Sequence, residues 1–163
     1  MNEPQRLYLV QARSDWEVYK LLSQIKGLPI CHELHYLQMC VEKLAKAYLW
    51  KNRGAAHLGH AALTKFIRAI AQNRDVAEGI GFSSRIAFGE WIKDISDLAY
   101  ELERLAPALA GGGPNPEYPW PRENPRYAPV EHEFTVWESL RTRSGECLWR
   151  MLDQLLRNFE AWF

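Results

Sequence analysis

An arginine and two histidines, Arg53, His57 and His60, lie within eight positions near the middle of the 163-residue chain. A histidine can take a proton from a ribose 2′-hydroxyl, and an arginine can stabilise the charged phosphorane that follows. In a dimer, two copies would converge on one phosphodiester. The spacing therefore suggests a metal-independent ribonuclease site. Because short motif matches are weak evidence, we give more weight to the alternative, in which His60 packs near a helix start and Arg53 lies in solvent.

Two pairs of histidines could also bind a metal ion. His32 and His35 are three residues apart, as are His57 and His60, so each pair shares one helix face. Two antiparallel helices joined by a short turn would hold the pairs some 30 Å apart, at a rise of about 1.5 Å per residue. We therefore expect no metal site, and we expect no cofactor.

A row of polar residues, Gln38, Glu42, Lys43 and Lys46, lies on the amphipathic segment 31–51. Lysines in such a row could meet a phosphate-bearing ligand as point charges. The alternative is a solvated or salt-bridged helix face, which is the commoner role of a mixed charge run. We list these four residues as candidate binding residues and give the alternative more weight.

Aromatic and basic residues alternate in a loop at 110–134 and include Trp120 and Arg122. The other members are Tyr118, Arg126, Tyr127 and Phe134. Such residues can stack on bases and touch phosphates in single-strand binders. The alternative is a loop held on the protein by its own rings. We favour the alternative because four glutamates offset the arginines: Glu117, Glu123, Glu131 and Glu133.

Apolar periodicity predicts helices that would position these residues. A first helix is expected from Ser14, with Ser14 and Glu17 as a capping box, and others at 31–51, at 56–72, from Ser83 or Ser84 to near Pro107, and from Ser144. We expect a turn at 52–54 and a loop at 73–82. Six prolines and three consecutive glycines rule out a helix at 111–134. The prediction is a single domain, 1–163, forming an all-α antiparallel bundle of about five helices, with an ordered Pro/Gly-rich loop at 110–134.

Composition narrows the class of protein. Hydrophobic residues make up 47% and charged residues 25%, and basic and acidic residues number 20 each, so the formal net charge is zero. This favours a soluble globular protein and argues against general affinity for nucleic acid or anionic membranes. No apolar run approaches the roughly 20 residues of a membrane span. We expect no membrane association and no secretory signal. The three cysteines suit free thiols in the cytoplasm.

The segment HYLQMCVEKLAKAYL (35–49) resembles the Q-x-x-E-K-x-x-K-A pattern of the HEPN family (higher eukaryotes and prokaryotes nucleotide-binding), with Gln38 slightly offset in register. Gly59, His60 and Leu63 are similar to the family's G-H-x-x-L segment. ELERLAPAL and NPEYPW are similar in style to bacterial members. The resemblance covers two helices well and implies a small helical bundle that commonly dimerises.

Several HEPN proteins are ribonucleases, often toxins or antiviral effectors, with an arginine and a histidine at the start of the last helix. Here Arg141 and Arg143 occupy that place without a histidine, whereas Arg53 and His60 fit the spacing elsewhere. The resemblance therefore supports the fold more than catalysis.

We expect a dimeric binding or interaction module that recognises a nucleotide, RNA or a protein partner between the segment 31–51 and the loop. The alternatives are a metal-independent dimeric endoribonuclease of toxin or defence type and a structural partner in a toxin–antitoxin system.

Overall fold

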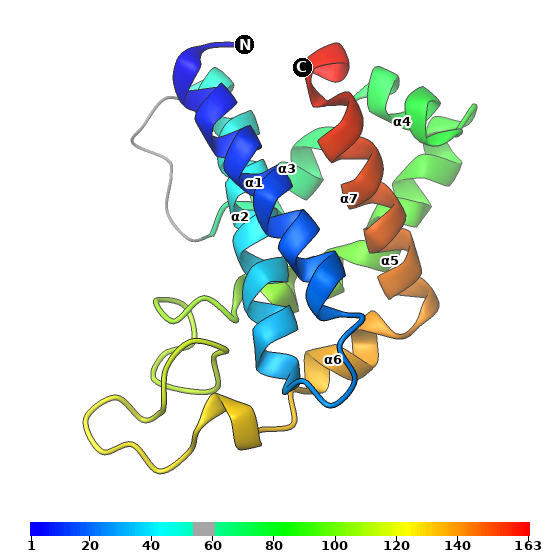
Figure 1. Ribbon diagram of the computed structural model, residues 1–163. Helices are drawn as coiled ribbons and strands as arrows, with labels where there is room; N and C mark the ends of the chain where they lie inside the picture. Colours follow the sequence, from blue (N-terminus) through cyan, green and yellow to red (C-terminus); the bar gives the residue numbers. More distant parts are fainter. Residues whose placement is uncertain (54–60) are drawn as a thin grey trace.

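The computed structural model describes residues 1–53 and 61–163, with positions 51–53 described by their backbone only. This part of the chain is all-α, which confirms the predicted helical bundle (Figure 1). Its helices are α1 (Glu3–Leu22), α2 (Ile30–Arg53), α3 (Leu63–Ile70), α4 (Arg74–Ile80), α5 (Arg85–Glu103), α6 (Thr135–Leu140) and α7 (Arg143–Trp162), with a short 3-10 helix, η2 (Pro129–Glu131). The β pairing among the described residues is a single bridge between Trp120 and Tyr127.

The first helix, α1, begins at Glu3 and not at Ser14, so the predicted start is wrong. Asn2 and Gln5 form the capping box: the Asn2 side chain accepts from the Gln5 N–H at 3.0 Å, and the Gln5 side chain accepts from the Asn2 N–H at 2.9 Å. This pair satisfies two N–H groups that the first turn leaves without partners. Ser14 instead lies exposed in mid-helix.

The second helix, α2, confirms the prediction for 31–51 and runs antiparallel beside α1 (Figure 1). It continues through Asn52 and Arg53, so the turn expected there is wrong at those two positions. Its inward stripe is fully buried and consists of Leu34, Leu37, Val41 and Leu44. The small residues Ala45 and Ala47 are also fully buried in α2, which contributes to the core shared with α1.

Between α2 and α5, the predicted helix 56–72 appears in its described part as α3. Residues 56–60 lie outside the described residues. The loop predicted at 73–82 is wrong, because α4 occupies most of it. The Asn73 side chain caps α4 by accepting from the Val76 N–H at 3.1 Å, and Gly81 ends it with φ of +99°.

A buried carboxylate from α5 caps α3, which has no capping side chain of its own. Glu103 is buried and accepts from the Thr64 N–H at 3.1 Å and from the Thr64 hydroxyl at 2.7 Å. A negative charge there also suits the positive end of the helix dipole. The predicted start of α5 is confirmed, with Ser84 as its cap.

The chain between Glu103 and Thr135 contains no α-helix and lies beside the N-terminal half of α2 (Figure 1). It leads into the short α6, which the sequence did not indicate, and then into α7, whose predicted start at Ser144 is one residue late. Gly145 lies at the sharp corner between these two helices. A Cβ atom there would collide with the Leu140 carbonyl group, so the corner requires glycine.

The last helix, α7, closes the bundle against α1, and both termini lie at the same end of the molecule (Figure 1). The Arg13 guanidinium donates to the Leu156 carbonyl at 2.8 Å and pairs with Glu160 at 2.7 Å. Further along, Trp149 packs 4.8 Å from the ring of Tyr19. Polar and aromatic contacts therefore both hold α7 on α1.

We expect Gly145→Ala to lower the free energy of unfolding by about 2 kcal/mol, because the added methyl group overpacks the corner against backbone. Gly89→Ala is the matched control: Gly89 lies in α5 with nothing within 4 Å of the Cβ position. That change should raise stability by roughly 0.5–1 kcal/mol, the difference in helix propensity. Urea denaturation of both variants gives the comparison. Equal changes in the free energy of unfolding for Gly145→Ala and Gly89→Ala would contradict the close contact between Gly145 and the Leu140 carbonyl group.

Two carboxylates should affect stability with opposite pH dependence. Burial raises the pKa of Glu33, whereas a hydrogen bond from Arg13 lowers the pKa of Glu160. Ionisation of Glu33 therefore opposes folding, and its cost grows as the pH rises through the pKa of the folded state. Ionisation of Glu160 favours folding, and its contribution is lost as the pH falls through the lowered pKa.

We expect Glu33→Gln to raise the Tm at pH 7 and Glu160→Gln to lower it. Both differences from the wild type should shrink as the pH falls below the ordinary carboxyl pKa of about 4.3. Thermal unfolding from pH 3 to pH 8 measures both. The same sign of change in both variants at pH 7 would contradict the opposite shifts.

Candidate functional site

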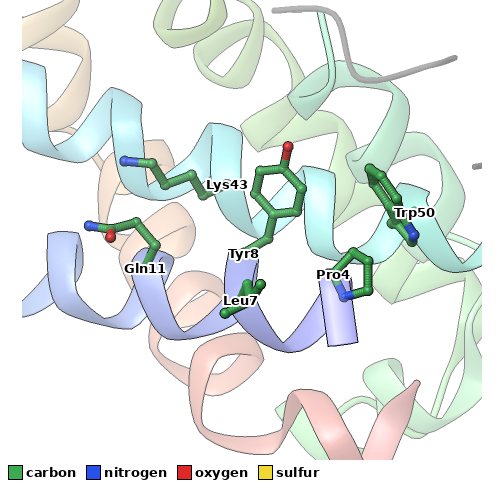
Figure 2. Close-up of a pocket in the computed structure, with 6 residues that line it drawn as sticks. All are labelled: Pro4, Leu7, Tyr8, Gln11, Lys43 and Trp50. Carbon is green, nitrogen blue, oxygen red and sulfur yellow. The ribbon is translucent and has the colours of Figure 1, made fainter. Parts of the chain in front are cut away.

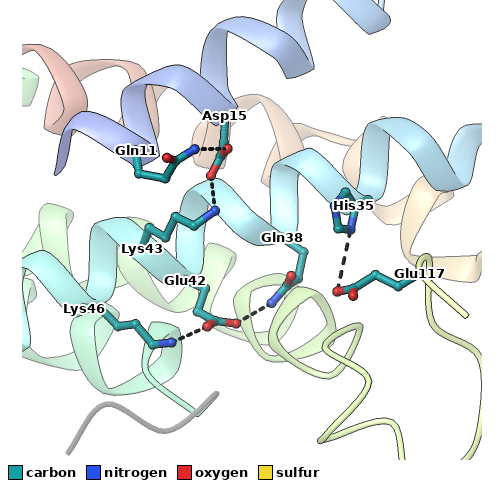
Figure 3. Close-up of polar contacts among 8 residues, drawn as sticks. All are labelled: Gln11, Asp15, His35, Gln38, Glu42, Lys43, Lys46 and Glu117. Atoms are coloured by element: carbon teal, nitrogen blue, oxygen red, sulfur yellow. Dashed lines mark hydrogen bonds and ion pairs between the residues drawn. The ribbon is translucent and has the colours of Figure 1, made fainter. Parts of the chain in front are cut away.

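The polar residues of α2 lie on two neighbouring faces of the helix, and each face has its own ion pair (Figure 3). Lys43 Nζ lies 2.5 Å from Asp15 Oδ2 of α1. On the other face, Lys46 Nζ lies 2.5 Å from Glu42 Oε1, and the Gln38 side-chain amide donates to Glu42 Oε2 at 2.8 Å. The four candidate binding residues are therefore engaged with protein groups.

Burial limits what these residues can bind. Gln38 is 2% exposed and Glu42 8% exposed. The side chains of Lys43 and Lys46 keep only 17% and 14% of their surface. A lysine that meets a phosphate must offer its ammonium group to solvent, and here each ammonium already faces a carboxylate. The Lys43–Asp15 pair joins α2 to α1, whereas the contacts of Gln38, Glu42 and Lys46 lie within α2.

The loop residues Trp120 and Arg122 have different environments. Trp120 is buried, with its ring 5.0 Å from His132 and 6.1 Å from Tyr127, so it anchors the loop. Arg122 is exposed and has no ion pair or hydrogen bond with another described residue. Glu117 connects the loop to α2, with its Oε1 3.6 Å from His35 Nδ1 (Figure 3).

The structure places few of the proposed catalytic residues. Arg53 is the last residue of α2, and only its backbone is described. His57 and His60 lie outside the described part of the chain. Arg141 and Arg143 are exposed just before and at the start of α7. In the described ranges, no three His, Cys, Asp or Glu side chains are grouped so as to hold a metal ion.

Two of the thiols are packing groups. Cys40 is fully buried, and its pKa is raised far above the ordinary thiol range. Burial is the larger cause, and the nearby charge of Asp15 is the smaller one. Burial also raises the pKa of Cys31. Since the thiolate is the reactive form, neither side chain is prepared for nucleophilic chemistry.

The outer side of the helix pair carries an open apolar groove of about 370 Å³ (Figure 2). We call it the α1–α2 groove; it is lined by Pro4, Leu7, Tyr8 and Gln11 of α1 and by Lys43 and Trp50 of α2. The Tyr8 and Trp50 rings lie 6.1 Å apart. Cavities of this size can hold a few side chains of a partner or a small ligand.

Helix α1 is apolar on two sides. Its inner side buries Leu9, Ala12 and Trp16, while Leu7 and Val10 are 53% and 50% exposed on the outer side. Apolar side chains that stay exposed on the outer side of such a helix offer a surface that a partner can cover. This groove was not predicted from the sequence, because no helix was predicted for residues 2–12. The spacing of Pro4, Leu7, Tyr8 and Gln11 was the available signal.

Charges around the α1–α2 groove are paired within the chain. Lys43 pairs with Asp15, and Arg6 pairs with Glu3 at 2.6 Å on the exposed side of α1. The Gln11 side chain donates to Asp15 Oδ1 at 3.0 Å. The groove therefore combines an apolar floor with a rim that has little net charge.

Comparison with protein-family models, curated proteins and solved structures finds no match for this chain. Across the described ranges, none of the helices has the length and apolar character needed to cross a membrane. The candidate site therefore rests on the geometry of this molecule.

The Lys43–Asp15 pair should contribute measurably to stability because both side chains are largely buried. In a double-mutant cycle with Lys43→Met and Asp15→Asn, we expect a coupling energy of about 1–3 kcal/mol from urea denaturation. The control cycle uses Lys93 and Glu90, which are 2.6 Å apart with side chains 72% and 65% exposed. Exposed pairs couple by about 0.5 kcal/mol. A coupling no larger at Lys43 than at Lys93 would contradict the role assigned to this pair.

Proposed function

We propose that the chain is a HEPN-like helical interaction module that forms a homodimer through the α1–α2 groove. The observation that supports the proposal most is the groove itself: an apolar hollow beside exposed Leu7, on a helix whose other side is already in the core. Burying apolar surface of this kind drives most protein association. Two of the HEPN-like residues of α2 hold the helix pair that presents the groove: Lys43 pairs with Asp15, and the Ala47 carbonyl accepts from the Gln5 side chain at 3.2 Å.

A protein surface fits the α1–α2 groove better than a nucleotide does. Its lining is mostly apolar and aromatic, and the one cation among its described lining residues, Lys43, is paired with Asp15. A phosphate would have to compete with that carboxylate for the ammonium group. An apolar side chain from a partner could instead enter beside Tyr8 and Trp50 and leave the ion pair intact.

A second copy of this chain is the partner that the charges favour. In a two-fold dimer the same surface meets itself, so an excess of either charge would repel. The Glu3–Arg6 and Lys43–Asp15 pairs keep this surface close to neutral. Leu7 lines the groove and is 53% exposed, so each copy offers an apolar side chain and an apolar surface to receive one. The dimer that the HEPN resemblance implies agrees with this arrangement.

We expect Leu7→Glu to weaken dimerisation at least tenfold, because about 1.5–3 kcal/mol of apolar burial is lost and a charge is added. Light scattering after size-exclusion chromatography, over a wide range of protein concentrations, measures the effect. Leu21→Glu is the control, since Leu21 is 62% exposed on the same helix and lies outside the groove. A wild-type protein that is monomeric throughout would contradict the proposal, and so would a dimer equally sensitive to both changes.

The same samples also test the ribonuclease alternative. Purified protein is incubated with total RNA in EDTA, beside Arg53→Ala and His60→Ala. Cleavage of RNA by the wild type that disappears in both variants would contradict the interaction module and identify the protein as a ribonuclease. An intact dimer without cleavage supports the interaction module.

A further inference from the structure

A second groove lies between α3 and α5, which pack against each other. It consists of two adjoining hollows of about 470 Å³ and 140 Å³ that share Arg68 and Ser96 in their linings. Thr64, Ile67 and Arg68 of α3 and the following residue Ala71 line the groove, and positions three or four residues apart lie on one helix face. We call this feature the α3–α5 groove. It shares no lining residue with the α1–α2 groove.

The floor of the α3–α5 groove is apolar and open. Ile67 and Ile92 form part of it, and Gly89 contributes no side chain, with nothing within 4 Å of its Cβ position. Ile86 at the rim is 79% exposed, more than any other large apolar side chain in the described ranges. Such a side chain gains free energy when a partner covers it.

The rim of the α3–α5 groove is cationic, although the whole chain has zero formal net charge. Arg68 is exposed and makes no hydrogen bond or ion pair with any described residue. Arg85 donates to the Gln72 side chain at 2.8 Å, which leaves its charge without a carboxylate partner. Lys93 pairs only with exposed Glu90, an interaction worth little in water.

Acidic residues of the groove do not balance the positive charge of this rim. Among the described residues that line the groove, Asp97 is the one carboxylate, and it lies in the smaller hollow. Three cations therefore border an apolar floor in the larger hollow. Glutamate or aspartate side chains of a partner could form ion pairs with these cations.

We propose that the α3–α5 groove docks an amphipathic helix of a partner protein, with apolar side chains against Ile86 and Ile92 and acidic side chains toward Arg68, Arg85 and Lys93. A groove between two packed helices accepts a third helix whose anchors recur at i, i+3 or i+4, and i+7. Complementary charge on its flanks fixes orientation and speeds association.

The lining favours a helix over a nucleic acid. Single-stranded nucleic acids bind to aromatic rings on which bases stack, whereas the floor here is aliphatic. The aromatic residue in the lining, Tyr100, lies in the smaller hollow and is already engaged by Arg104, whose Nη1 donates to its hydroxyl at 3.1 Å.

A displayed library of random helical peptides tests the proposal. Selection uses the full chain, and peptides that also bind an Arg68→Glu, Ile86→Glu double variant are removed. We expect the enriched peptides to carry net negative charge and apolar residues at helical spacing. Both changes are at exposed positions, and circular dichroism confirms that the double variant is folded.

The best enriched peptide is then synthesised with a fluorescent label, and its Kd is measured by anisotropy. We expect Arg68→Glu and Ile86→Ala each to weaken binding about tenfold, the loss of one good anchor contact. Lys26→Glu, a charge reversal at an exposed position outside the groove, should leave the Kd unchanged. Binding should also weaken as salt is added.

Three results would overturn the proposal. The first is a set of enriched peptides without acidic excess, and the second is equal binding of the peptide to the wild type and to both groove variants. The third is tight binding of a labelled uridine 20-mer that Arg68→Glu abolishes and Ile86→Ala leaves intact. That result would identify a phosphate-binding surface, because a docked helix needs Ile86 and a phosphate backbone does not. The dimerisation measurements on Leu7→Glu are independent of these outcomes.

Discussion

The ion pair between Lys43 and Asp15 is the interaction on which the arrangement of the first two helices depends. It joins α1 to α2 in a place that water barely reaches, so neither charge can be left alone without a large cost. Together with the fully buried leucine stripe of α2, it fixes which side of α1 faces the core and which faces outward. The outward side carries Leu7 and Val10, so the proposed dimer surface follows from the same constraint.

The molecule presents two grooves with different chemistry. The α1–α2 groove is apolar with paired charges at its rim, which suits contact with an identical surface. The α3–α5 groove has an aliphatic floor and a rim with three cations, of which only Lys93 has a carboxylate partner among the described residues, and this suits an acidic partner. Because the two share no residue, one dimer could hold two partner helices at once. A module of this kind would act by bringing proteins together.

Long helices with strong periodicity were predictable from the sequence. The inward stripes of α2, α5 and α7 recur every three or four residues, and the predicted α2 and α5 agree closely with the structure. Short helices were not predictable: α4 and α6 have seven and six residues, too few for a pattern to show. The start of α1 was not predicted correctly, because Ser14 and Glu17 have the spacing of a capping box as well, whereas the capping box of the structure is formed by Asn2 and Gln5.

By itself the sequence determined the all-α class and picked out the polar residues of α2, since periodicity and charge are properties of a single helix. Whether those residues face a ligand depends on what packs beside them, and only the tertiary structure decided that. Asp15 of α1 and Glu42 of α2 take up the two lysines, and Trp120 is buried as an anchor. Grooves arise between helices, so their linings combine residues that lie far apart in the chain. Spacing within one helix, as of Pro4, Leu7, Tyr8 and Gln11, indicates one wall of such a groove and leaves the other wall unknown.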